Sequence, residues 1–92
     1  MANHPSALKR HRQSEKRRVR NQAIKTRLRH LVREVRTAIS GHDATAAAKS
    51  LAIASRALDK AVTKGVLHRN AASRKIARLA RAVSQLPGAA SR

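Results

Sequence analysis

The sequence predicts an all-α protein: a three-helix antiparallel bundle with a long, basic, overhanging first helix. The first observation is composition, because 19 Ala stand against three Gly and two Pro, and alanine is the best helix former. The second is the absence of Phe, Tyr and Trp, which leaves few residues that favour strands. The third is a helical repeat of aliphatic residues in three segments. A chain of 92 residues suits a single domain, residues 1–92, with a thin core.

The first helix is expected from about residue 6 to residue 40. Aliphatic residues in its second half recur at steps of four, three, four and four, which is one face of an α-helix. They are Ile24, Leu28, Leu31, Val35 and Ile39. Gly41 is expected to end this helix in the left-handed conformation, and Asp43 follows as the expected N-cap of the next helix. A short turn therefore joins two antiparallel neighbours.

The second helix is expected from about residue 44 to residue 63. Its core stripe consists of Ala47, Leu51, Ala54, Leu58 and Ala61, with Ile53 and Val62 beside it. The small residues in this stripe allow a neighbouring helix to approach closely. Gly65 is expected as the glycine that ends the helix, after which Val66 and Leu67 pack back onto the bundle.

The third helix is expected from about residue 70 to residue 86, with Asn70 as its N-cap. Its core stripe repeats at steps of four, three, four and three, and consists of Ala72, Ile76, Leu79, Val83 and Leu86. Pro87 and Gly88 end it and open the tail, residues 87–92. Within this tail, residues 89–92 are expected to fray because they have nothing to bury. Each of the three stripes is expected to bury against the other two.

Upstream of Ile24, the face that continues the core stripe of the first helix becomes polar and cationic. It carries Arg10, Gln13, Arg17, Arg20 and Asn21. Cations also stand on other sides of this rod, at Arg12, Lys16 and Arg18. Between residues 9 and 29 the chain has ten Lys or Arg and one acid, so the acids that normally neutralise a solvated helix are missing. This segment is predicted to overhang the bundle and to bind an anionic partner.

The charge of the whole chain points to the same partner. A formal charge of +18, from 22 Lys and Arg against four acids, destabilises a compact state through self-repulsion unless a polyanion neutralises it. Nucleic acid is the expected polyanion. A simple solvated face remains the interpretation for three cations of the second helix, Lys49, Arg56 and Lys60.

No arrangement of residues suggests catalysis, a metal ion or a cofactor. The four acids are scattered, Cys is absent, and no glycine-rich loop could hold a nucleotide phosphate. The five His residues include no pair at the i, i+4 spacing that binds zinc on a helix. Glu15 is expected to pair with Arg12 or Arg18, three residues away on the same helix. The chain is therefore not expected to be an enzyme, and no small-molecule substrate is expected.

The sequence also bears on location. No apolar run approaches membrane-spanning length, and the N-terminus lacks the apolar core of a secretory signal. Residues 1–40 are rich in Arg and poor in acids, as an organelle transit peptide is. This interpretation is disfavoured because removal of the segment would take away the helix against which the others pack. A membrane-active amphipathic helix is disfavoured because residues 9–18 carry no bulky apolar residue opposite the charge.

RNA is favoured over DNA on two grounds. With no aromatic side chain, the chain has no stacking platform for splayed bases, so it must hold backbones. Cations on all sides of one rod suit insertion among helical segments of a folded RNA, whereas one DNA duplex presents phosphates mainly on one side. A nucleoid-type DNA-binding protein remains the alternative. Such a protein would be expected to form a dimer or to carry an apolar side chain that intercalates between base pairs.

Two stretches carry a resemblance to a known family. MANHPSALKRHRQSEKRRVRN at the N-terminus and DKAVTKGVLHRNAASRKIARLA, residues 59–80, are similar to the opening and closing blocks of the bacterial small-subunit ribosomal protein S20 family. The resemblance covers nearly the whole chain. It implies a three-helix bundle with a long first helix, which binds 16S ribosomal RNA directly at the lower part of the small-subunit body. It also implies a cytoplasmic, non-catalytic role in assembly, as a monomer in each ribosome with few protein neighbours.

The resemblance also implies which residues line the RNA. One of them, Asn3, precedes the first helix. In the first helix they are Ser6, Lys9, Arg10, Arg12, Gln13, Lys16, Arg17, Arg18, Arg20 and Asn21, and the basic run adds Lys25, Arg27 and Arg29. Further along the chain they are Lys64, His68, Arg69, Asn70, Arg74, Lys75 and Arg78. Two positions depart from the family pattern, with Pro5 where a Lys is expected and Ala77 where a Ser is expected. Pro5 removes a cation and fits at or before the first helical turn.

Overall fold

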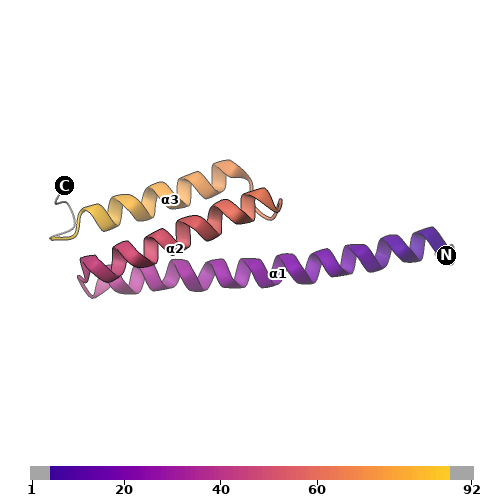
Figure 1. Cartoon of the computed structure of the whole chain (residues 1–92), viewed down its shortest axis with the longest axis horizontal. Helices are drawn as coiled ribbons and strands as arrows, with labels where there is room; N and C mark the ends of the chain where they lie inside the picture. The colour runs from indigo at the N-terminus through magenta and orange to yellow at the C-terminus, as the bar shows by residue number, and fades with distance from the viewer. Residues whose placement is uncertain (1–4, 88–92) are drawn as a thin grey trace.

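The computed structural model describes residues 5–87 and contains three helices in that range (Figure 1). They are α1 (Pro5–Ser40), α2 (Ala44–Thr63) and α3 (Arg69–Ser84). The all-α prediction is confirmed, and the helix bounds lie within two residues of those expected from the sequence. The molecule measures 62 × 21 × 15 Å because α1 runs far past the other two helices. The predicted fraying falls on residues 89–92, which lie outside the described residues.

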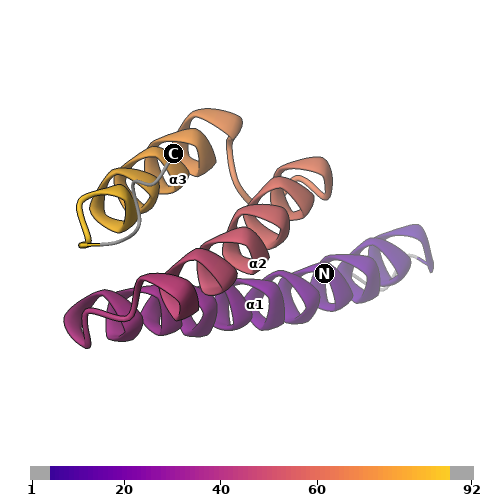
Figure 2. The same cartoon turned by 60° about the vertical axis from the view of Figure 1, so that its left-hand side comes forward.

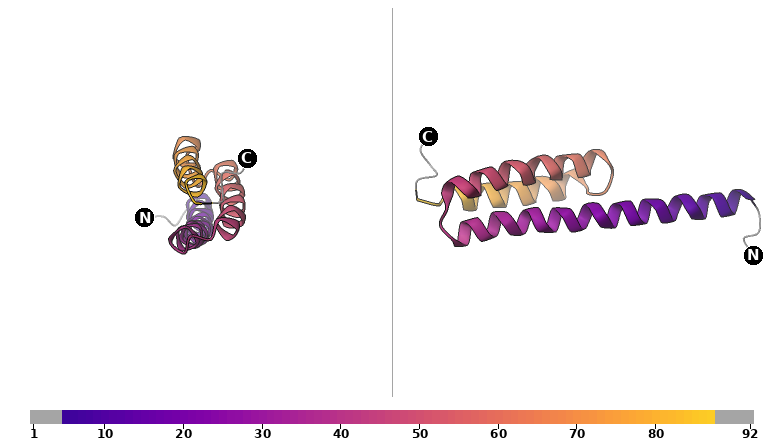
Figure 3. Two further views of the ribbon diagram at one scale, coloured as in Figure 1. Left: turned by 90° about the vertical axis from the view of Figure 1, so that its left-hand side faces the viewer. Right: turned by 60° about the horizontal axis from the view of Figure 1, so that its bottom comes forward.

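The helices are antiparallel to their neighbours in the chain, and α2 packs against both α1 and α3 (Figure 2). The backbones of α1 and α3 approach each other much less closely, although their core side chains meet in a shared cluster. Figure 3 shows this arrangement end-on and from below. The expectation that each stripe buries against the other two is confirmed, because buried residues of all three helices share one cluster. The wider separation of α1 and α3 leaves a groove between their backbones.

The turn between α1 and α2 differs from expectation at one residue. His42 and not Gly41 takes the left-handed conformation, with φ of 56°. The amide of His42 donates to Ile39 O at 3.0 Å and that of Asp43 donates to Ala38 O at 3.1 Å, which is the Schellman pattern with its left-handed residue at position 42. The expected N-cap of α2 is confirmed, since Asp43 Oδ1 accepts from the Ala46 amide at 3.0 Å.

The second turn follows the prediction at its start and departs from it at its end. Gly65 has φ of 78° and ends α2, and Val66 and Leu67 pack back onto the core as expected. The helix α3 begins one residue earlier than predicted, because His68 Nδ1 accepts from the Asn70 amide at 3.1 Å and caps the helix. The prediction of Asn70 as the N-cap is therefore wrong. An imidazole nitrogen supplies the acceptor that the amide side chain was expected to supply.

The core consists of two adjoining clusters of buried aliphatic residues. One contains Val32, Val35, Ala47, Ala54, Leu79, Val83 and Leu86, and the other contains Leu28, Leu58, Ala61 and Ala72. Ile24, Leu31, Leu51, Ile39 and Ile76 are half-buried at the edges of these clusters. Among the described residues no polar side chain is buried. The bundle is thus held by the packing of leucine, valine and alanine side chains.

Two core assignments need correction. In α1 the deeper residue is Val32, at 8% exposure, and not the half-buried Leu31. A helix of 3.6 residues per turn permits both the steps 28, 31, 35 and the steps 28, 32, 35, so the periodicity alone did not distinguish them. In α2 the side chain of Ile53 is 49% exposed, because it stands on the edge of the helix that turns away from both neighbours.

Candidate nucleic-acid interface

The first part of the interface is the segment of α1 that precedes its first core residue, Ile24. We call residues 5–23 the overhang. Every residue from Leu8 to Arg20 is exposed, and the segment extends past the turn between α2 and α3 (Figure 1). At 1.5 Å per residue it is roughly 28 Å long. The prediction of an overhanging basic half-helix agrees with this exposure.

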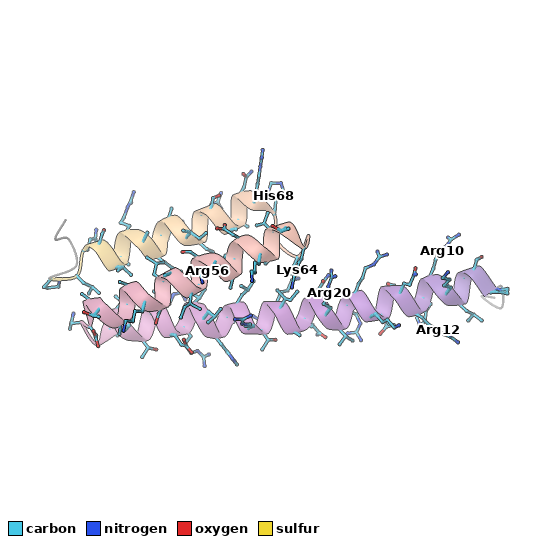
Figure 4. All side chains as sticks on the ribbon, viewed as in Figure 1. Arg10, Arg12, Arg20, Arg56, Lys64 and His68 are labelled. Atoms are coloured by element: carbon cyan, nitrogen blue, oxygen red, sulfur yellow. The ribbon has the colours of Figure 1, made fainter. Side chains whose placement is uncertain are left out.

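Cations leave the overhang in different directions. Arg10 and Arg12 project to opposite sides of α1, and Arg20 projects from α1 close to the bundle (Figure 4). Successive residues of a helix are separated by about 100° around the axis, so Lys16, Arg17 and Arg18 fan out in the same way. A ligand that neutralises all of them must be anionic on more than one side of the rod.

The one acid of the overhang neutralises only one of these cations. Glu15 Oε2 accepts from Arg18 Nη2 at 3.0 Å and from Arg18 Nε at 3.3 Å. Within residues 5–87 this is the only ion pair, and it selects Arg18 over Arg12 as the partner. The hydrogen bond from Arg18, followed by the positive charge of Arg18, lowers the pKa of the Glu15 carboxyl. The same hydrogen bond, followed by the negative charge of Glu15, raises the pKa of Arg18. Both side chains remain about half exposed, so water screens the pair.

The second part of the interface is the turn between α2 and α3. Ile24, Val66 and Leu67 all pack against the same core cluster, which places this turn beside the point where the overhang begins. Lys64 and Arg20 lie in this region (Figure 4). The turn thus adds exposed polar residues at the base of the overhang: Lys64, His68, Arg69 and Asn70.

His68 has a structural role that its place in the predicted RNA-binding set did not include. Since its Nδ1 accepts from the Asn70 amide, the neutral ring carries its proton on Nε2. In that tautomer His68 caps α3 and can donate from Nε2 to a phosphate or sugar oxygen at the same time.

The third part is the α1–α3 groove, which two adjoining hollows form. The hollows have volumes of about 490 and 680 Å³ and share Val32, Arg36 and Lys75. The groove brings together Lys25 and Arg29 with Arg74, Lys75 and Arg78 of the predicted set. It also contains two cations that the sequence reasoning missed, Arg33 and Arg36. The available signal was the continuation of cations at positions 25, 29, 33 and 36 beside the core stripe.

The predicted residues therefore fall into three groups and not one surface. The overhang holds Ser6, Lys9, Arg10, Arg12, Gln13, Lys16, Arg17, Arg18, Arg20 and Asn21, the turn and the groove hold those named above, and Arg27 is exposed on α1 outside the groove. Asn3 lies outside the described residues.

No group of three His, Cys, Asp or Glu side chains in the described part of the chain could hold a metal ion. None of the helices within residues 5–87 combines the length and apolar character needed to cross a membrane.

A thin aliphatic bundle with a cation-covered helix projecting from it is the arrangement expected of a small, all-α nucleic-acid-binding protein. Comparison with known proteins gives the particular family, because residues 2–84 match the family model for Ribosomal protein S20. The chain belongs to the ribosomal protein S20 family, as the resemblance in its two end blocks implied. Membership in this family of structural components also agrees with the prediction that the chain is not an enzyme.

Relatives match along nearly their whole length. The chain is 52% identical over 86 residues to small ribosomal subunit protein bS20 of Maridesulfovibrio salexigens, covering 94% of this chain and 99% of that protein. It is 54% identical over 86 residues to the protein of that name from Corynebacterium efficiens, covering 94% and 99%. With the one from Solidesulfovibrio magneticus it shares 49% identity over 89 residues, covering 97% and 100%.

Proposed function

We propose that this chain is a structural component of the small ribosomal subunit that binds 16S ribosomal RNA directly, as a single domain and as one copy in each ribosome of the bacterial cytoplasm. Its relatives are named small ribosomal subunit proteins. The overhang inserts among segments of the folded RNA, while the bundle anchors one end of the rod. Few protein neighbours are needed, because the cationic surface is satisfied by RNA.

One observation supports insertion above all others: residues 8–20 are exposed on every side and carry cations in several directions. A helix lying along one duplex would need cations on one face only. A helix surrounded by phosphates from several RNA segments would need the arrangement found here. The role is thus to neutralise converging backbones that would otherwise repel one another, which stabilises the folded RNA.

The test compares two triple variants that lose the same charge. One combines Arg10→Ala, Arg17→Ala and Arg20→Ala in the overhang; the other combines Lys49→Ala, Arg56→Ala and Lys60→Ala on the exposed face of α2. In filter binding to a 16S ribosomal RNA transcript, we expect the overhang variant to lose about tenfold or more in affinity. The α2 variant should stay within about threefold, since it removes only screened, long-range attraction. Equal losses would contradict the proposal.

The alternative, a nucleoid-type DNA-binding protein, is tested by competition. An excess of duplex DNA should displace the labelled 16S transcript far less well than unlabelled transcript does, because the duplex can engage only one side of the overhang. If duplex DNA and unlabelled transcript displace the labelled transcript equally well at the same concentration of phosphate groups, the DNA-binding alternative is favoured.

A further inference from the structure

The α1–α3 groove is unusual for its lack of acids. Seven cations line it: Lys25, Arg29, Arg33, Arg36, Arg74, Lys75 and Arg78. Acids occur on the other side of α1, where Glu34 and Asp43 line a hollow against α2. Acids are therefore absent from the lining of the groove, although they are present elsewhere in the bundle. Like charges that face each other across a hollow repel, and only an anion between them turns this repulsion into attraction.

The two walls and the floor of the groove differ in chemistry. On α1 the cations follow one another at steps of four, four and three residues, which is a spacing of roughly 4.5 to 6 Å along the helix axis. On α3 the cations stand between Ala71 and Ala82, whose short side chains keep the groove open. The floor is aliphatic and includes Leu28, Val32, Leu58, Leu67 and Leu79.

We propose that the α1–α3 groove binds one strand of RNA backbone, with its phosphates paired to the cations of both walls and its sugars over the aliphatic floor. This inference rests on the proposed function and adds to it a second RNA contact, on the bundle and separate from the overhang. A linear row of phosphates matches a linear row of cations, and the sugars present an apolar edge that requires no hydrogen bond from the floor.

An acidic amphipathic helix is a different occupant, and the floor argues against it. Such a helix is held mainly by burying apolar side chains. The residues of the floor have little surface left to bury, since Leu58 is 1% exposed and Leu28 is 7% exposed. The groove attracts a ligand mainly through the cations of its walls. The phosphates of a backbone strand can pair with these cations along the whole length of the groove.

Cross-linking locates the strand directly. The chain contains no cysteine, so Ala71→Cys places one thiol in the groove and Ala48→Cys places one on the exposed face of α2 as a control. Each full-length variant carries a photoreactive benzophenone maleimide and is irradiated in complex with the 16S transcript. We expect RNA adducts from position 71 at several times the yield from position 48. Equal yields, or adducts with an added polyglutamate peptide but not with RNA at position 71, would overturn the inference.

Matched charge variants test the energetic role. Arg36→Gln with Lys75→Gln removes one cation from each wall, and Lys49→Gln with Arg56→Gln removes two exposed cations from α2. We expect the groove pair to weaken binding of the 16S transcript about fivefold or more relative to the α2 pair. Thermal melts establish that both pairs fold.

The outcomes separate the two proposals. If the overhang variant loses affinity while the groove pair equals its α2 control and position 71 gives no excess adducts, the groove inference is wrong and the proposed function stands. If neither the overhang nor the groove variants differ from their controls, the proposed function fails as well. A loss from the groove pair with excess adducts at position 71 supports the inference.

Discussion

The two halves of α1 are one continuous helix with opposite surroundings. The second half buries Leu28, Val32 and Val35 against α2 and α3, whereas residues 8–20 of the first half bury nothing. Most helical stability in proteins comes from packing an apolar face, and helix propensity alone is marginal in water. The overhang must obtain its stability from elsewhere, and its cations repel one another until an anion arrives. The bundle is therefore expected to fold by its own core, whereas the overhang is expected to need an anionic partner to become fully ordered.

The largest expected difference is in hydrogen exchange of the free protein. Amides around Val35 should exchange only through opening of the bundle, and those of Lys16 to Arg20 through local unravelling of the overhang. We expect protection in the two regions to differ by about a thousandfold or more. Adding 16S ribosomal RNA should raise protection in the overhang, because ordering is then coupled to binding. Strong protection of residues 16–20 without RNA would remove the distinction between the halves.

The next largest effect comes from one substitution made in both halves. Leu28 is 7% exposed and Leu8 is 46% exposed, so Leu28→Ala leaves a cavity and Leu8→Ala does not. We expect the free energy of unfolding to fall by about 2 to 4 kcal/mol for Leu28→Ala and by less than about 0.5 kcal/mol for Leu8→Ala. Urea titrations of both variants measure this. Similar losses would mean that the overhang packs on the bundle in solution.

The same burial values revise the expectation for Leu31, which the periodicity placed in the core. Because Leu31 is half-buried and Val32 is the deeper residue, Leu31→Ala should cost less than Leu28→Ala.

A third measurement concerns the salt dependence of RNA binding. If the chain neutralises some eight phosphates, log K should fall with log salt at a slope of roughly −6 to −7. Removal of one overhang arginine, such as Arg12, Arg17 or Arg18, should reduce the size of that slope by somewhat under one unit. A plain RNA duplex should give a shallower slope than the 16S transcript, since it engages fewer sides of the overhang. Equal slopes for the two RNAs would contradict insertion.

Local chemistry decided which parts of this structure the sequence could predict. Asp43 and Gly65 were predictable because each is the best residue at its position for the cap or the left-handed turn. The caps at His42 and His68 were missed because a more usual residue, Gly41 or Asn70, stands one or two positions away. Sequence preferences tell which residue types are most common as helix caps. The hydrogen bonds of the folded turn determine which residue takes that role.

The functional surface shows a similar limit. The overhang was predictable because charge density and a missing stripe are properties of one segment of chain. The α1–α3 groove depends on how far apart two helices stand, and no sequence window contains that distance. Arg33 and Arg36 were therefore left out, although their spacing continues that of Lys25 and Arg29.

The smallest expected effect concerns Glu15, the only acid of the overhang, where helix stability and RNA affinity should change in opposite directions. In the Glu15→Gln variant Arg18 loses its ion pair, so the overhang should be slightly less helical in the free protein. RNA affinity should nevertheless rise, by less than about tenfold. The variant leaves Arg18 free to bind a phosphate and removes a carboxylate that the RNA phosphates repel.

Lowering the pH should change RNA affinity in the same direction in the unsubstituted chain. The pKa of Glu15 is lowered by Arg18, so its stabilising contribution is present above the ordinary pKa of a glutamate and is lost as pH falls through the lowered value. Circular dichroism and filter binding between pH 3 and 6 would follow both quantities, with Glu15→Gln as the control that should not respond at this site. A fall in RNA affinity in the Glu15→Gln variant would mean that the preformed helix matters more to binding than the charge it carries, and the overhang would then resemble the bundled half more than its exposure indicates.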